Sequence, residues 1–151
     1  MPETILIVDD GNDDAELLRL TLGQIGLINP IQVVHTAAEA IAYVQGDFPY
    51  SDRAKFPPPK IILLDLNMPR MSGFDFLQWL SANKQLADMM VIVVSGMEDW
   101  PSMRRAYELG ATSFLTKPCR PFDLEHLIEW FPRYWTRPEP PLPPELPSSG
   151  A

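Results

Sequence analysis

Short apolar runs that alternate with longer amphipathic stretches constrain the fold of this chain more than any other feature. Most of these runs are apolar throughout, which is typical of parallel strands covered on both faces. The expected strands lie near residues 4–9, 31–35, 60–65, 90–95 and 112–116, and the expected helices near 13–26, 36–46, 73–84, 100–109 and 122–135. This alternation predicts an α/β fold with a parallel sheet and right-handed crossovers.

Chemically active side chains follow four of the expected strands. Asp9 and Asp10 end the first strand, Asp65 ends the third, Ser95 ends the fourth and Lys117 ends the fifth. Each pattern alone is common in turns and at helix starts. Ligands of open parallel sheets bind at the carboxyl ends of the strands, so four such patterns at one edge predict a site.

The three carboxylates call for a cation, because like charges a few Å apart repel one another. Oxygen ligands suit a hard divalent ion, and the absence of histidine and cysteine from these strand ends disfavours zinc and iron. We expect Mg²⁺ to be held by Asp10 and Asp65, by Asp9 directly or through water, and by the backbone carbonyl of Asn67.

Lys117 and Ser95 would add a positive charge and a hydroxyl donor beside Asp65. Together with the metal they would surround a tetrahedral anion. A carboxylate is a competent nucleophile, so the set predicts phosphoryl transfer to Asp65, with Lys117 and Ser95 stabilising the transferred group.

Composition excludes several classes of function. A chain of 151 residues is most economically one domain, and its net charge of -8 argues against direct nucleic-acid binding and a polybasic membrane anchor. The single cysteine, Cys119, allows neither an intrachain disulfide nor a multi-cysteine zinc site. We expect a cytoplasmic protein, because neither a signal peptide nor a membrane-spanning run of about 20 apolar residues is visible.

The ordered motifs resemble those of the response-regulator receiver domain of two-component signalling, over about residues 3–135. The matching segments are Ile7-Val8-Asp9-Asp10, Leu63 to Pro69 with Ser72-Gly73, Val93-Val94-Ser95-Gly96, and Gly110 to Pro118. The resemblance implies a flavodoxin-like (βα)5 doubly wound sheet with strand order 2-1-3-4-5. It also implies phosphorylation-controlled signalling, with a sensor histidine kinase as the donor.

The resemblance assigns roles residue by residue. It implies Asp65 as the phosphoacceptor, Asp9, Asp10, Asp65 and Asn67 around Mg²⁺, and Ser95 and Lys117 on the phosphoryl group. Ser95 and Phe114 fall at the family's switch positions, and the Lys117–Pro118 peptide is expected to be cis. Gly11 departs from the polar residue that often follows the acidic pair, and Met97 occupies a position that bears on water access.

Two segments depart from a minimal receiver. We expect the receiver to span residues 1–136, with a loop insertion at about 46–59, and residues 137–151 to form a disordered Pro-rich tail. The insertion, and a chain that shows no output domain, resemble the small stand-alone regulators that partner phytochromes.

Three other functions remain open from sequence alone. A phosphatase of the haloacid-dehalogenase type also uses an aspartyl nucleophile, but it needs an acid two residues further on, where this chain has Asn67 after Asp65. A flavin- or nucleotide-binding domain of the same fold needs a phosphate loop, which the acidic residues 9–14 oppose. A degenerate receiver acting as a constitutive scaffold is disfavoured by the full residue set.

The last expected helix carries more aromatic side chains than one buried face can hold. We expect Trp130, Tyr134 and Trp135 to form a surface patch, and such patches tend to mark partner sites. A second copy is the simplest partner, because two-fold dimers are the commonest oligomers, so we expect a homodimer.

Overall fold

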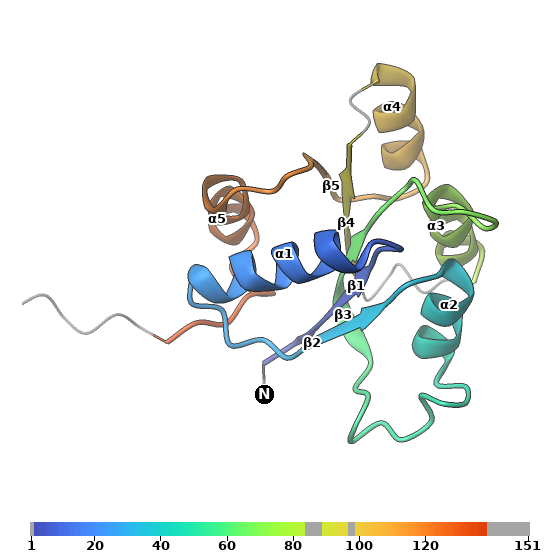
Figure 1. The fold of residues 1–151 in the computed structure, drawn as a ribbon, viewed down its shortest axis with the longest axis horizontal. Helices are drawn as coiled ribbons and strands as arrows, with labels where there is room; N and C mark the ends of the chain where they lie inside the picture. The colour runs from blue at the N-terminus through green and yellow to red at the C-terminus, as the bar shows by residue number, and fades with distance from the viewer. Residues whose placement is uncertain (1, 84–88, 97–98, 139–151) are drawn as a thin grey trace, which may run out of the picture.

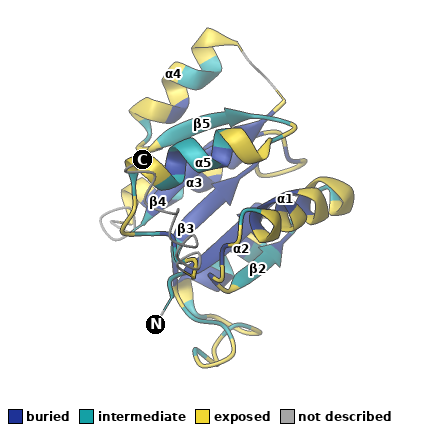
Figure 2. Ribbon diagram, turned by 90° about the vertical axis from the view of Figure 1, so that its left-hand side faces the viewer, coloured by how far each residue is buried: buried dark blue, intermediate teal, exposed yellow. Residues whose placement is uncertain are grey.

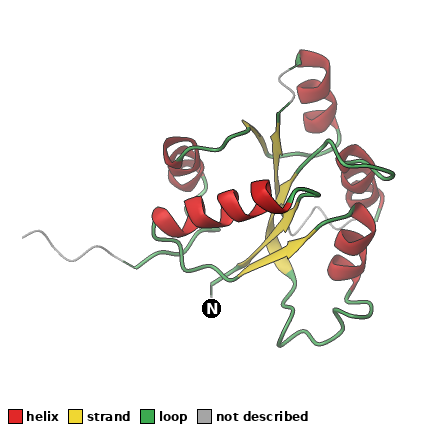
Figure 3. Ribbon diagram, viewed as in Figure 1, coloured by secondary structure: helices red, strands yellow, loops and turns green. Residues whose placement is uncertain are grey.

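A five-stranded parallel sheet with the strand order β2-β1-β3-β4-β5 organises the protein (Figures 1 and 3). The computed structural model describes residues 2–83, 89–96 and 99–138. The elements are β1 Thr4–Val8, α1 Asn12–Gln24, β2 Ile31–Val34, α2 Ala37–Gln45, β3 Pro59–Leu64, α3 Gly73–Ala82, β4 Met90–Ser95, α4 Trp100–Glu108, β5 Ser113–Thr116 and α5 Pro121–Trp130. The predicted flavodoxin-like fold and strand order are confirmed.

Helices cover both faces of the sheet, so the central strands are buried on both sides (Figures 1 and 2). Ile5 and Ile7 of β1 pack on the side of α1 and α5, whereas Leu6 and Val8 pack on the side of α2 and α3. All five residues of β1 and all six of β4 are buried. This burial explains why the central strands read as continuous apolar runs.

Strand register brings the polar strand ends to one edge of the sheet. Val8 of β1 is paired with Leu64 of β3, so Asp9 and Asp65 follow neighbouring strands at the same level. Ser95 of β4 is paired with Thr116 of β5, and Lys117 comes next in the chain. The parallel topology therefore gathers the four predicted motifs.

The loop after β3 is held close to α3 by a glycine. A Cβ atom on Gly73 would lie 2.3 Å from the backbone oxygen of Asp65 and 2.7 Å from Cα of Leu66. Ser72 caps α3 by accepting from the backbone N–H of Asp75, whose side chain accepts in return from the N–H of Ser72. The capping box and this close approach fix the backbone on which Asp65 sits.

The insertion before β3 is an ordered loop with its own aromatic anchor. The rings of Tyr43, Tyr50 and Phe56 contact one another at centroid distances of 5.0 to 6.1 Å. Arg53 donates to the backbone oxygens of Val44 and Phe56 at 2.8 and 3.1 Å, and so ties the loop to the end of α2.

The predicted end of the last helix is wrong. Helix α5 ends at Trp130, because Pro132 lacks an N–H and disfavours helical geometry at Phe131. The chain then turns back, and Trp135 enters the core against α1 and α5 with only 7% of its surface exposed. The expectation that Trp135 belongs to a surface patch is therefore also wrong.

The segment after α5 is tied to the turn between α1 and β2. The Asn29 amide donates to the backbone oxygens of Glu3 and Tyr134, at 2.7 and 3.0 Å, and its oxygen accepts from the N–H of Thr136 at 2.7 Å. Arg137, which we expected in the disordered tail, pairs with Glu125 at 2.7 Å. The rest of the predicted tail, from residue 139 onward, lies outside the described residues. In the part of the chain that is described, no helix is long and apolar enough to cross a membrane.

Candidate functional site

Three carboxylates meet at the carboxyl edge of the sheet. Oxygen atoms of Asp9, Asp10 and Asp65 all lie within 4.8 Å of one another. Asp9 and Asp65 are buried, with 3% and 4% of their surfaces exposed, and Asp10 faces solvent. This all-oxygen set, open to solvent on one side, fits a hard divalent cation that keeps some of its water ligands.

The environment of Asp65 opposes its negative charge. The pKa of Asp65 is raised to about 6, chiefly by burial and also by the neighbouring Asp9 and Asp10. The N–H of Asn67, which donates to Oδ1 at 3.0 Å, and the charge of Lys117 act in the opposite direction. A buried carboxylate whose charge is poorly compensated gains much from a cation or from conversion to a paired phosphoryl group.

Lys117 supplies the positive charge of the site. Its Nζ lies 2.8 Å from Oδ2 of Asp9, 3.1 Å from Oδ2 of Asp14 and 3.5 Å from Oδ2 of Asp65. Burial lowers the pKa of Lys117, but the hydrogen bonds to Asp9 and Asp14 and the nearby charges outweigh it and raise that pKa overall. The ammonium group is therefore charged at neutral pH.

Ser95 and Phe114 lie on neighbouring strands. Ser95 is fully buried at the end of β4, and its backbone oxygen accepts from the N–H of Lys117 at 2.9 Å. Phe114 is paired in register with Val93, two residues before Ser95, and is partly buried against the core on the α2 and α3 side. The two proposed switch residues are thus on the same face of adjacent strands.

The remaining predicted positions have mixed outcomes. Asn67 lies at the site, because its N–H donates to Oδ1 of Asp65. The metal-binding role of its carbonyl remains a prediction. The Lys117–Pro118 peptide is cis, as the resemblance implied. The N–H of Gly11 donates to Oδ1 of Asp9 at 2.9 Å. Met97 lies outside the described residues.

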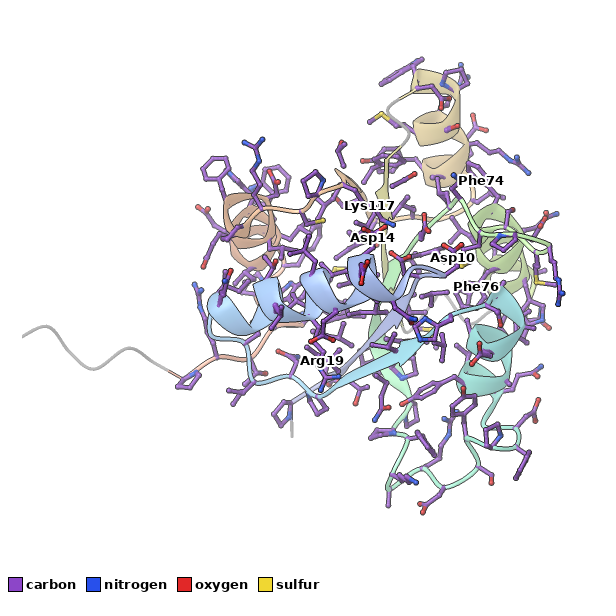
Figure 4. The ribbon with its side chains drawn as sticks, in the orientation of Figure 1. Asp10, Asp14, Arg19, Phe74, Phe76 and Lys117 are labelled. Atoms are coloured by element: carbon purple, nitrogen blue, oxygen red, sulfur yellow. The ribbon has the colours of Figure 1, made fainter. Side chains whose placement is uncertain are left out.

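Sequence reasoning missed Asp14. It stands in the first turn of α1 and reaches Lys117 across 103 positions of sequence (Figure 4). Within the acidic segment 9–14 nothing distinguishes it from Asp13. The available signal was its place in the first turn of a helix that starts at the same sheet edge as the other site residues.

Comparisons with known proteins place the chain in a family. The family described as response regulator receiver domain matches residues 5–129, which is most of the chain. The chain belongs to this family, and it is accordingly a phosphorylation-controlled signalling domain of the two-component type. The predicted family is confirmed, and the phosphatase and scaffold alternatives are not favoured.

Similar proteins include response regulators, some of them described as bacteriophytochrome regulators or as acting in red light signalling. "Response regulator Rcp1" of Synechocystis is 27% identical over 134 residues, which cover 89% of each chain, and its Mn²⁺-bound crystal structure is similar with a TM-score of 0.74, 28% identity and coverage of 91% and 99%. A response regulator described as acting in red light signalling of R. palustris has a TM-score of 0.78 at 26% identity and covers 93% of this chain and 100% of its own. The bacteriophytochrome response regulator RtBRR has a TM-score of 0.80 at 28% identity, with coverage of 95% and 86%.

Proposed function

We propose that this protein receives a phosphoryl group on Asp65 from a sensor histidine kinase of the phytochrome type. The observation that carries the proposal is the position of Asp65: a buried acid at a strand end, between two other carboxylates and a lysine. The phytochrome connection is supported by the similarity to a regulator of red light signalling and to a bacteriophytochrome response regulator. The proposal places the protein in the cytoplasm, where a kinase has access to ATP.

Asp9, Asp10 and Asp65 would hold Mg²⁺, together with the carbonyl of Asn67. When bound, the ion supplies positive charge to the oxygens of the transferring group. The oxygen-only donor set supports a hard cation, and the crystal structure of Rcp1 with Mn²⁺ shows that a related regulator binds a divalent metal.

The two oxygens of Asp65 have different surroundings. Oδ1 accepts from the N–H of Asn67, whereas Oδ2 faces Lys117 at 3.5 Å. We therefore assign Oδ2 as the nucleophile. It forms the new bond to phosphorus as the bond from phosphorus to the donor's nitrogen or oxygen breaks. Lys117 and the hydroxyl of Ser95 then stabilise the phosphoryl oxygens of the product.

Phosphorylation is expected to move Ser95 and Phe114 together. A dianion on Asp65 offers an acceptor to the Ser95 hydroxyl, and the shift of that side chain leaves space on the face where Phe114 lies. Structures with and without beryllofluoride test this switch. Identical contacts of the Phe114 ring in both would exclude it.

The phosphorylation site is tested with acetyl phosphate and intact-mass spectrometry. The wild type is expected to gain one phosphoryl group in Mg²⁺ and none in EDTA, and Asp65→Asn is expected to gain none. A phosphoryl gain that persists in Asp65→Asn would refute the assignment. Phosphotransfer from a panel of purified histidine kinases then identifies the donor.

We also propose self-association through the exposed aromatics of α5. Phe122, His126 and Trp130 form an edge-to-face ladder along this helix, and Phe122 and Trp130 are 70% and 67% exposed. Tyr134 is only partly buried and packs at the edge of the core, so it remains a candidate at the rim. Such exposed aromatic surface favours a partner.

Sedimentation of the wild type and Trp130→Ala, with and without beryllofluoride, tests this surface. A dimer that weakens in the variant is expected. Leu20→Ala serves as the control, because Leu20 is a large exposed apolar residue on α1 at 56% exposure. A wild type that stays monomeric in both states at high concentration would exclude the homodimer.

A further inference from the structure

We propose that Asp14 is a positioning residue that holds the Lys117 ammonium away from Asp65 until the phosphoryl group arrives. The inference rests on the proposed function of Asp65 and concerns how readily the reaction proceeds. It assigns a role to a residue outside the acidic cluster that would hold the metal.

The three distances around Nζ of Lys117 carry the argument. Asp9 and Asp14 lie at 2.8 and 3.1 Å, whereas Asp65 lies at 3.5 Å. The Asp9 contact has the length of a charge-assisted hydrogen bond, about 2.7–2.9 Å, and Lys117 also donates a hydrogen bond to Asp14 at 3.1 Å, whereas the longer distance to Asp65 marks a weaker contact. Asp14 is the partner that draws the ammonium group toward α1, because Asp9 follows β1 beside Asp65.

The two bonded carboxylates differ in how easily they release the lysine. The Asp9 side chain is 5% exposed and would lose a charge partner in a buried place. The Asp14 side chain is 56% exposed, and water can replace the lysine there. When a dianion forms on Asp65, the bond that yields is therefore the one to Asp14.

The surroundings of Lys117 leave space for this exchange. A cavity of about 230 Å³ lies between α1 and the segment after β5, and Asp14, Leu17, Val94 and Lys117 are among its lining residues. The Lys117 side chain therefore borders open space next to Asp14, so its contact with Asp14 is not fixed by close packing on that side. The exchange thus couples the first turn of α1 to the state of Asp65.

Removal of the Asp14 charge is expected to favour the phosphorylated state. In Asp14→Asn, the phosphoryl group on Asp65 no longer competes with Asp14 for Lys117. Acetyl phosphate should therefore phosphorylate the variant about threefold faster, which corresponds to the free energy of a half-exposed ion pair. Asp14→Glu retains the charge and should restore the wild-type rate.

Asp13→Asn is the matched control. Asp13 is exposed in the same turn of α1, and within the described part of the chain it makes no ion pair. Asp13→Asn removes one negative charge from the N-terminal turn of α1, as Asp14→Asn does. The inference requires Asp13→Asn to stay close to the wild-type rate. Equal acceleration in both variants would show that the change in net charge alone causes the effect, and it would overturn the inference.

A second measurement does not depend on phosphorylation. The ¹⁵N NMR signal of the Lys117 ammonium group reports how fast its protons exchange with water, and ion pairing slows this exchange. Faster exchange in Asp14→Asn than in Asp13→Asn is expected, and equal exchange would overturn the inference. If the wild type were never phosphorylated on Asp65, the proposed function would fail, while this readout would still judge the Asp14–Lys117 contact.

Discussion

Asp65→Asn is expected to stabilise the metal-free protein at neutral pH, although it abolishes the phosphoacceptor. Asp65 is 4% exposed, and burial raises its pKa from the ordinary value of 3.8 to about 6. The folded protein therefore binds the Asp65 proton more tightly than the unfolded chain does. The contribution of Asp65 to stability is full below about pH 4 and falls as the pH rises through about 6.

The magnitude follows from the size of that shift. One pKa unit corresponds to about 1.4 kcal/mol, so a shift of about two units means that the ionised group lowers the free energy of unfolding by up to about 3 kcal/mol at pH 7.5. Asp65→Asn removes this destabilising charge but does not recover the full amount. The buried amide still has to be desolvated, and Lys117 loses its attraction to the Asp65 carboxylate. We expect a net gain of about 1–3 kcal/mol, or roughly 3–9 °C in Tm.

Thermal unfolding followed by circular dichroism in EDTA measures the effect. The gain in Asp65→Asn should shrink as the pH is lowered from 7.5 toward 4, and Mg²⁺ should stabilise the wild type more than the variant. Asp13→Asn removes an exposed carboxylate and should change Tm little. A variant less stable than the wild type at pH 7.5 in EDTA, or a gain independent of pH, would refute the reasoning.

Three further substitutions probe the parts that hold the site and its frame. Gly73→Ala should lower stability by about 1–3 kcal/mol and slow phosphorylation, because its Cβ would lie 2.3 Å from the backbone oxygen of Asp65; chemical denaturation and acetyl phosphate kinetics measure both effects. Asn29→Ala should cost about 1–3 kcal/mol in urea unfolding, because it leaves partly buried backbone groups of Tyr134 and Thr136 without their amide partner. Arg53→Met should free the insertion and speed its cleavage in limited proteolysis, while the circular dichroism of the fold stays unchanged.

Each of these three substitutions has an outcome that would contradict its prediction. Gly23→Ala is the control for Gly73, since space around Gly23 is open and alanine there should be neutral or stabilising. A Gly73→Ala protein with unchanged stability would show that the loop after β3 yields easily. Full stability of Asn29→Ala would mean that water replaces the amide. An unchanged cleavage rate in Arg53→Met would show that the aromatic contacts hold the loop without the Arg53 hydrogen bonds.

The site residues at the strand ends are predictable from sequence because the topology of a parallel sheet brings the carboxyl ends of its strands to one edge. Asp9, Asp65, Ser95 and Lys117 each follow a strand, and one general rule about sheet edges suffices to bring them together. Asp14 escapes such a rule. Its contact with Lys117 depends on the rotation of α1 about its own axis, which packing of the helix against the sheet determines.

The segment after α5 differs from its prediction for a related reason. Apolar periodicity continues past Trp130 and favours a longer helix, whereas Pro132 stops it, and the fate of Trp135 then depends on a distant partner. Asn29 holds the residues on either side of Trp135 through hydrogen bonds to the backbone of Tyr134 and Thr136, which span 105 and 107 positions. The anchor of the insertion is likewise tertiary, since Tyr43 reaches across to the backbone of Pro57.

The Asn29 amide also has a consequence for protein engineering. The same side-chain nitrogen donates to backbone oxygens near both ends of the described part of the chain, those of Glu3 and Tyr134. A short peptide linker could therefore join the two ends, and new termini could be opened within the exposed insertion near Phe48, which is 89% exposed. The domain could then be spliced into a loop of a fluorescent or enzymatic host as a phosphorylation-responsive cassette.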